Sequence, residues 1–263
     1  MSSNIKRQPN PPVAELRLRP HARIRLFCFP YAGGSSQIFR NWSDSLSQEI
    51  EVCLLQLPGR GNRIQEPAHT GLDALVQDIF EGIIPYLSKP FAFFGHSMGA
   101  LVSFELARYL RRMQAPVPAQ LFLSGRSAPQ IPDADPPTYN LPEAEFIKAV
   151  RSLNGTPGEV LEHPELMRLM IPLLRADFSV CQTYSYVAES PLNCPITAFG
   201  GLEDNEVARE SLEAWREHTT DDFKLRMLPG DHFFLHSQQA QLLRILSQEL
   251  YQLMRTERFL INV

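Results

Sequence analysis

The chain has 263 residues, of which 44% are hydrophobic and 21% are charged, a balance that suits one globular domain with a sizeable core. Its formal net charge of -4 and its isoelectric point near 6.0 predict no broad attraction to nucleic acid or to an anionic membrane. No segment approaches the ~18 apolar residues of a membrane-spanning helix, and the N-terminus lacks the apolar segment of a signal peptide. We therefore expect a soluble, cytoplasmic protein. We also expect it to be a monomer.

The chain begins with a polar, proline-rich stretch over residues 1–20, where we expect a flexible arm without regular structure. The rest, residues 21–263, is expected to form one domain in which short apolar segments alternate with segments of helical period. The expected strands are residues 24–29, 52–57, 91–94, 121–124, 196–199 and 223–228, and the expected long helices are residues 72–87, 100–112 and 239–254. This alternation predicts an α/β fold with a mostly parallel central sheet flanked by helices.

The alternation stops between about residues 130 and 194, where proline-rich loops lead into helical segments at residues 143–153 and 164–184. An insertion of this length between two strands is typical of a helical lid. Its apolar residues are expected either to line a pocket under the lid or only to pack the lid onto the body. These residues are Met167, Met170, Ile171, Leu174 and Phe178.

The cysteines show no sign of a metal site. Cys28, Cys53, Cys181 and Cys194 lack the close Cys-x-x-Cys or Cys/His spacing that zinc requires. Two of them, Cys28 and Cys53, lie within apolar strand segments, which favours reduced thiols in the core. We expect neither a metal nor an organic cofactor.

A Gly-His-Ser-Met-Gly motif at residues 95–99 carries the most specific chemical signal. It follows the expected strand 91–94 and leads into the expected helix 100–112, which is the setting of a nucleophile elbow. Glycines on both sides of Ser97 let the strand and the helix approach closely around a strained turn. The turn exposes Oγ at the carboxyl edge of the sheet, where the helix N-terminus directs free N–H groups at a developing oxyanion.

A serine hydroxyl becomes a nucleophile when a histidine removes its proton and a carboxylate orients that histidine. His232 is the predicted base, because a Pro-Gly-Asp turn after the expected strand 223–228 places it at the same edge of the sheet. His236, further along the chain, is expected to point away, and His96 is expected to pack in the core. The other histidines are expected on the surface, and they are His21, His69, His163 and His218.

Asp204 is the predicted carboxylate, because it lies just after the expected strand 196–199 and two glycines. Asp231 is adjacent to His232 and is expected not to reach its Nδ1. Glu203 and Glu206 remain alternatives to Asp204.

A glycine-rich loop, residues 29–35, follows the expected strand 24–29 and has the paired glycines that a second oxyanion donor requires. It could also be a plain turn. It lacks the spaced glycines and the lysine of a phosphate-binding loop.

Taken together, these motifs closely resemble the type II thioesterases, the stand-alone editing enzymes of polyketide and non-ribosomal peptide synthesis, which have the α/β-hydrolase fold. The resemblance runs in the family's order from about residue 24 to residue 254. The matching motifs are FPYAGGS (29–35), LPGRG (57–61), FGHSMGA (94–100), SGR (124–126), RADF (175–178) and GDHFFL (230–235). The resemblance implies a triad of Ser97, Asp204 and His232, with an oxyanion hole formed by the N–H groups of Ala32 and Met98.

The resemblance also implies a substrate class, an acyl thioester on the phosphopantetheine arm of an acyl carrier or peptidyl carrier protein, and a lid that opens to admit that arm. The same triad would serve a carboxylesterase or an acyltransferase on small esters. A catalytically silent binding module is a third alternative, against which the intact Ser97, Asp204 and His232 argue. Ser127 departs from the family pattern, in which a second basic residue often follows the SGR motif, and this departure weakens the case for a contact of this loop with a phosphate or a carrier protein.

Overall fold

The computed structural model describes residues 13–16, 19–132, 135–153, 155 and 163–256. Its centre is a seven-stranded sheet of order β1-β3-β2-β4-β5-β6-β7, in which β1 is antiparallel to β3 and every other neighbouring pair is parallel. The strands are β1 (Val13–Leu16), β2 (Ile24–Phe29), β3 (Ile50–Leu55), β4 (Phe91–His96), β5 (Gln120–Ser124), β6 (Ile196–Gly201) and β7 (Phe223–Leu228). The predicted α/β class with a mostly parallel sheet is confirmed.

Helices cover both faces of the sheet. They are α1 (Trp42–Ser45), α2 (Leu72–Ile83), α3 (Met98–Arg112), α7 (Arg209–Glu213), α8 (Phe234–Ser237) and α9 (Gln239–Leu253). Short 3-10 turns occur at Ser36–Phe39, Gly61–Arg63, Ile84–Tyr86 and Ala214–His218. The long helices and the strands agree with the predicted bounds to within about two residues at each end, except that α2 stops early, ahead of Pro85.

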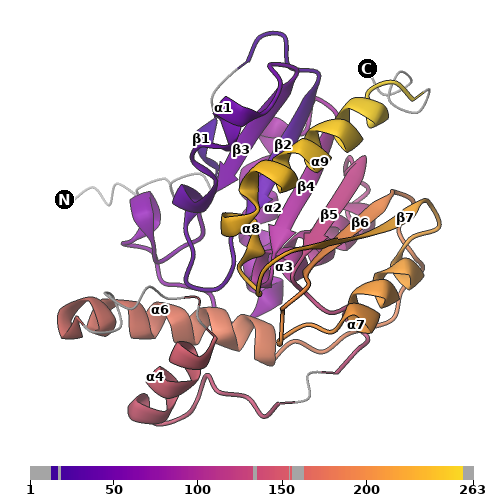
Figure 1. Ribbon diagram of the computed structural model, residues 1–263. Coiled ribbons are helices and arrows are strands. Elements are labelled where there is room, and N and C mark those ends of the chain that lie inside the picture. The colour runs from indigo at the N-terminus through magenta and orange to yellow at the C-terminus, as the bar shows by residue number, and fades with distance from the viewer. Residues whose placement is uncertain (1–12, 17–18, 133–134, 154, 156–162, 257–263) are drawn as a thin grey trace, which may run out of the picture.

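The central strands are buried on both sides, which explains their almost continuous apolar sequence. Alternate residues of β2 and β4 face opposite layers: Phe27 and Phe93 belong to the core under α2 and α3, whereas Leu26 and Phe94 belong to the core under α9. In Figure 1, α9 (yellow) crosses the front of the sheet while α2 and α3 lie behind it. This three-layer arrangement buries the central strands and sets their carboxyl ends at one edge of the sheet.

The predicted N-terminal arm is wrong at Val13–Leu16, which forms β1. The strand pairs antiparallel with β3 in a register that sets Val13 against Leu55 and Leu16 against Cys53. An edge strand needs only backbone pairing on one side, so a short segment after two prolines can form it despite a weak sequence pattern. Residues 1–12 and 17–18 of the predicted arm lie outside the described residues.

The insertion between β5 and β6 contains two helices, α4 (Glu143–Ser152) and α6 (Pro164–Gln182), as the sequence predicted. Figure 1 shows them as a separate layer at the bottom of the view. They share a small apolar cluster of their own, composed of Phe146, Val150, Met167, Ile171 and Leu174, with Met170 and Phe178 packed against it. Packing within the insertion therefore accounts for most of the apolar residues predicted there.

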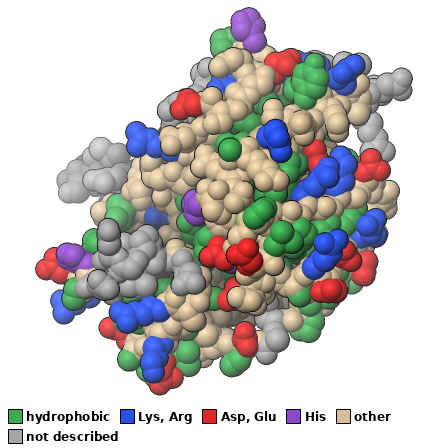
Figure 2. Space-filling model, in the orientation of Figure 1, with side chains coloured by type: hydrophobic (Ala, Val, Ile, Leu, Met, Phe, Trp, Pro, Cys, Tyr) green, Lys and Arg blue, Asp and Glu red, His purple; other side chains and the backbone are tan. Residues whose placement is uncertain are grey.

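Other described features bear on the composition-based expectations. No helix in the described part of the chain is long and apolar enough to cross a membrane. On the face in Figure 2, acidic side chains are interspersed with basic ones, and neither sign dominates.

Cys28, Cys53 and Cys194 are buried, and burial raises the pKa of each thiol. Among the described residues, no group of three or more His, Cys, Asp or Glu side chains is placed to hold a metal ion.

Candidate active site

Ser97 occupies the sharp turn between β4 and α3, where its backbone adopts φ 53° and ψ -115°. This positive φ is strained for a residue with a side chain. A Cβ atom at Gly95 would overlap the backbone of Gly99, and one at Gly99 would overlap the carbonyl oxygen of Phe29. Both glycines of the motif are therefore required by close backbone contact, as the sequence predicted.

The start of α3 and the loop after β2 lie against each other at this turn. Gly99 packs on the carbonyls of Phe29 and Pro30, which precede Ala32 by three and two residues. Met98 is the first residue of α3, so its N–H has no acceptor within the helix. The N–H of Ser97 donates to the carbonyl of Ser124 on β5 over 2.7 Å, which anchors the turn to the sheet.

Asp204 and His232 meet at the same edge of the sheet, after β6 and β7. Nδ1 of His232 lies 2.9 Å from Oδ2 of Asp204, whose side chain is fully buried, whereas the His232 side chain is 14% exposed. The other carboxylate oxygen, Oδ1, accepts from the backbone N–H groups of Glu206 at 2.8 Å and Val207 at 3.2 Å. The carboxylate is thus held on both oxygens and orients the imidazole ring.

The alternative carboxylates occupy other positions. Asp231 is exposed, and its Oδ1 accepts from the N–H of Phe233 at 2.9 Å, within its own turn. Glu203 and Glu206 are exposed as well. Of the candidates named from the sequence, Asp204 is the one that the structure brings to Nδ1 of His232.

A cleft of about 310 Å³ opens between the loop after β2 and helix α6. Its lining residues are Tyr31, Ala32, Gly33, Gly34, Ser35, Gln37, Ile38, Gly155, Leu166 and Met170. Of the apolar residues predicted in the insertion, Met170 lines this cleft while also packing against the cluster of α4 and α6. The glycine-rich loop and the inserted helix thus form opposite walls of one cleft.

Comparison with known proteins places this geometry in a family. A family model described as "Thioesterase domain" matches residues 24–250. The gramicidin S biosynthesis protein GrsT of Aneurinibacillus migulanus is 52% identical over 229 residues, 87% of this chain and 90% of GrsT. Linear gramicidin dehydrogenase LgrE of Brevibacillus parabrevis is 49% identical over 237 residues, 89% of this chain and 90% of LgrE. The solved structure of the type II thioesterase BorB from the borrelidin biosynthetic cluster has a TM-score of 0.80 and 33% identity, covering 88% of this chain and 94% of BorB.

The chain belongs to the thioesterase family. The matched region begins with β2 and ends in α9, so it includes strands β2 to β7, the insertion and every loop of the candidate site. The predicted resemblance to the type II thioesterases and the predicted α/β-hydrolase fold are confirmed. Thioester hydrolysis is the activity that the family model and the similarity to the type II thioesterase BorB support.

His96 of the thioesterase is fully buried, which agrees with its predicted packing role. Its Nδ1 lies 2.9 Å from Oγ of Ser124, and its ring centroid is 5.2 Å from that of His232. Burial, followed by the nearby His232 and His236, holds the pKa of His96 well below its usual range. A neutral ring therefore packs beside His232. His236 lies on the exposed side, with Nε2 3.0 Å from the hydroxyl of Tyr31.

The expectation that His218 lies on the surface is wrong. The residue is 6% exposed and its ring packs edge-on against Phe104 and Trp215, with centroids 5.1 and 5.4 Å away. Its Nε2 lies 2.5 Å from Oε1 of Gln130. Burial, followed by the positive charge of Arg108, lowers the pKa of His218 to about 4.

His218 is expected to lower the free energy of unfolding as the pH falls from about 6.5 to about 4. The unfolded imidazole takes up its proton near pH 6.5 and the folded one near pH 4, so the unfolded state binds more protons in this window. The total effect is up to about 3 kcal/mol. His218→Gln retains an amide beside Gln130 but does not titrate. Denaturant titrations at about pH 7 and about pH 4.5 should therefore show a smaller decrease for the variant, and an equal decrease would contradict this assignment.

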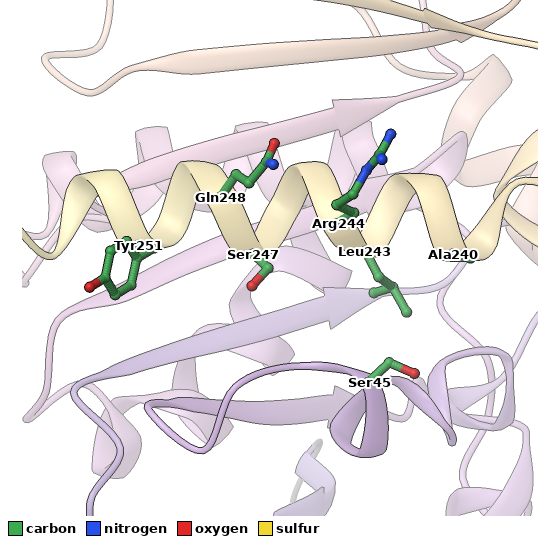
Figure 3. A pocket seen from close by; sticks show the side chains of 7 residues that line it. All are labelled: Ser45, Ala240, Leu243, Arg244, Ser247, Gln248 and Tyr251. Atoms are coloured by element: carbon green, nitrogen blue, oxygen red, sulfur yellow. The ribbon is translucent and has the colours of Figure 1, made fainter.

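A second groove, of about 500 Å³, lies on the surface between α1 and α9. Its lining residues are Ser45, Ala240, Leu243, Arg244, Ser247, Gln248 and Tyr251. In Figure 3 the side chains of Ser45 and Leu243 approach each other, while those of Arg244 and Gln248 point away. None of the predicted site residues lines this groove, so we assign it no part in the chemistry.

Proposed function

We propose that this thioesterase hydrolyses acyl groups from the phosphopantetheine arm of acyl carrier or peptidyl carrier proteins, with Ser97, Asp204 and His232 as its catalytic triad. The observation that carries the proposal is the hydrogen bond from His232 to the doubly anchored carboxylate of Asp204. Asp204 follows β6 and His232 follows β7, and these two strands are parallel. They belong to the same sheet as β4, which ends at the Ser97 elbow. A buried carboxylate that orients a histidine at this sheet edge is the support that a serine nucleophile requires.

In the proposed acylation step, His232 accepts the proton of Ser97 as Oγ attacks the thioester carbonyl. Asp204 holds the proton on Nδ1 and stabilises the imidazolium that forms. Collapse of the tetrahedral intermediate breaks the C–S bond, and the pantetheine sulfur leaves with a proton from His232. The leaving thiol has an ordinary pKa of about 8.5, so it departs more readily than the amine of an amide would.

In deacylation, His232 accepts a proton from water as the water oxygen attacks the acyl-serine ester. Collapse of this second tetrahedral intermediate breaks the C–Oγ bond, Oγ of Ser97 takes the proton back from His232, and the acid is released. The N–H groups of Met98 and Ala32 are the proposed donors to the oxyanion in both steps. Met98 starts α3 and Ala32 lines the cleft, so both belong to the two segments that Gly99 brings into contact. The apolar wall that Leu166 and Met170 form in this cleft suits an acyl chain.

The relatives narrow the setting of the reaction. GrsT is named for the biosynthesis of gramicidin S and BorB for a borrelidin cluster, which supports a carrier-bound substrate for this chain. LgrE is named a dehydrogenase, but the first turn after β2 here reads Gly33-Gly34-Ser35-Ser36 and lacks the G-x-G-x-x-G spacing of a dinucleotide site. The α4–α6 insertion, which forms one wall of the cleft, is the proposed lid.

The decisive experiment compares wild-type hydrolysis of an acyl-carrier thioester, the matching acyl-pantetheine thioester and the matching oxygen ester. We expect kcat/KM to decrease in that order, because carrier contacts contribute binding and the thiol is the better leaving group. A higher kcat/KM for the oxygen ester would assign a carboxylesterase. Formation of a new ester when an alcohol is added would assign an acyltransferase.

A further inference from the structure

Helix α6 of the insertion packs directly onto two glycine-rich loops of the body. A Cβ atom on Gly33, in the loop that carries Ala32, would lie 2.6 Å from Cδ2 of Leu174. A Cβ atom on Gly59, in the LPGRG loop after β3, would lie 3.2 Å from Cδ1 of Leu173. Both glycines have positive φ, 76° and 82°. Glycine at these positions thus gives the loops their shape and lets the helix approach them.

A buried ion pair lies at the centre of this contact. Arg60 of the LPGRG loop donates through Nη1 to Oδ2 of Asp177 on α6 at 2.7 Å and through Nη2 to Oδ1 at 2.6 Å. The same Oδ2 accepts from the backbone N–H of Gly33 at 2.7 Å. Nη1 of Arg60 also donates to the carbonyl of Gly34 at 2.9 Å. The Arg60–Asp177 pair therefore binds both the N–H of Gly33 and the carbonyl of Gly34 in the loop that carries Ala32.

The buried position of the Arg60–Asp177 pair favours a role in shaping the loop after Ala32 over a role in stability. Arg60 is 5% exposed and Asp177 is 2% exposed, so both charges are withdrawn from water. A buried pair of this kind contributes little net stability compared with apolar residues, because desolvation offsets the attraction. Its geometry, however, fixes the backbone of the residues that directly follow Ala32. An oxyanion donor must be held to a fraction of an ångström, because small displacements of catalytic groups lower rates steeply.

We propose that Asp177 and Arg60 are positioning residues that hold the oxyanion loop in its reactive shape, so that the lid helix α6 completes the oxyanion hole. The inference rests on the proposed role of the Ala32 N–H. Asp177 and Arg60 touch the loop backbone and act through it on the reacting carbonyl. The Ala32 N–H is therefore correctly placed to stabilise the tetrahedral intermediate only when α6 is packed against this loop.

Asp177→Asn is the test variant, because the change is isosteric and removes one acceptor. In either orientation, the amide NH₂ would face an N–H of Arg60 or Gly33, and two donors repel each other. Arg60→Lys is the second variant: it retains the positive charge beside Asp177 but loses the planar fork that also reaches Gly34. It keeps the proposal testable if Asp177→Asn folds poorly.

Glu51→Gln is the matched control. Glu51 and Arg25 form a similarly buried pair, 0% and 8% exposed, near the beginnings of β3 and β2 at the opposite edge of the sheet. Loss of this pair should lower the thermal unfolding midpoint without reaching the oxyanion loop. The control separates the general effect of breaking a buried ion pair from an effect on catalysis.

The measurement is steady-state hydrolysis of an acyl-pantetheine thioester, together with the inhibition constant of a trifluoromethyl ketone that carries the same alkyl chain. Oγ of Ser97 adds to the carbonyl of this ketone, which places a full oxyanion in the oxyanion hole. For Asp177→Asn we expect kcat to fall by about 10- to 100-fold with KM nearly unchanged, and the inhibition constant to rise by a similar factor. Arg60→Lys should show a smaller change in the same direction. Glu51→Gln should leave kcat and the inhibition constant at wild-type values.

Wild-type inhibition by the ketone in folded Asp177→Asn or Arg60→Lys would overturn the inference, as would an equal loss of inhibition in Glu51→Gln. A failure of the proposed function has a different signature. In that case the wild-type protein itself would neither cleave the thioester nor bind the ketone more tightly than the matching ketone without fluorine. The two failures are therefore distinguishable within one set of proteins.

Discussion

Ser97→Ala is expected to lower kcat for an acyl-pantetheine thioester by about 10⁴-fold or more while the fold remains intact. Alanine retains a Cβ and adopts the same strained turn, so only Oγ is lost, and without it no acyl-enzyme can form. The remaining N–H donors still stabilise direct attack by water, which leaves a small residual rate. The measurement is release of free thiol under saturating substrate, with circular dichroism to show that the variant is folded.

Ser103→Ala is a suitable control for this variant. Ser103 is a buried serine of α3, and its hydroxyl donates to the carbonyl of Ala100 at 2.9 Å. We expect this variant to keep wild-type kcat and to react with a fluorophosphonate probe, whereas Ser97→Ala should not react. Wild-type turnover in Ser97→Ala would show that another group is the nucleophile.

Part of the geometry of the candidate site could be predicted because its residues follow local patterns. Ser97, Asp204 and His232 each come within four residues of the end of a parallel strand, and parallel strands direct their carboxyl ends to a common edge. The structure brings His232 and Asp204 into contact at that edge. The glycines around Ser97 were predictable for a similar reason, since the turn requires close backbone approach whatever the rest of the fold does.

The features that sequence reasoning missed depend on contacts between distant segments. Arg60 and Asp177 are separated by 117 positions, and no spacing rule links a loop arginine to a helix aspartate. The burial of His218 depends on aromatic residues from α3 and from its own 3-10 turn. Strand β1 forms because an edge of β3 is available, and its own four residues carry little signal. The ion pair, the buried histidine and the edge strand each depend on contacts with segments that are distant in the sequence.

Asp204→Asn is expected to lower kcat by about 10³- to 10⁴-fold, because it reverses the tautomer of His232. Oδ1 of Asp204 accepts from the N–H groups of Glu206 and Val207, so the amide oxygen of asparagine will take that position. Its NH₂ group then faces Nδ1 of His232, which must become an acceptor and leave the proton on Nε2. An imidazole in that form cannot remove the proton of Ser97. The kcat of the folded variant, measured on the same thioester, tests this expectation.

Asp231→Asn separates this effect from a simple loss of negative charge near His232. Asp231 is exposed, and its Oδ1 accepts from the N–H of Phe233, a bond that an asparagine oxygen can also make. We therefore expect wild-type kcat from Asp231→Asn. If both variants lost activity equally, the charge of the loop would matter more than the tautomer, and the orienting role of Asp204 would be wrong. If only Asp204→Asn lost activity, the hydrogen bond to Nδ1 would be the cause.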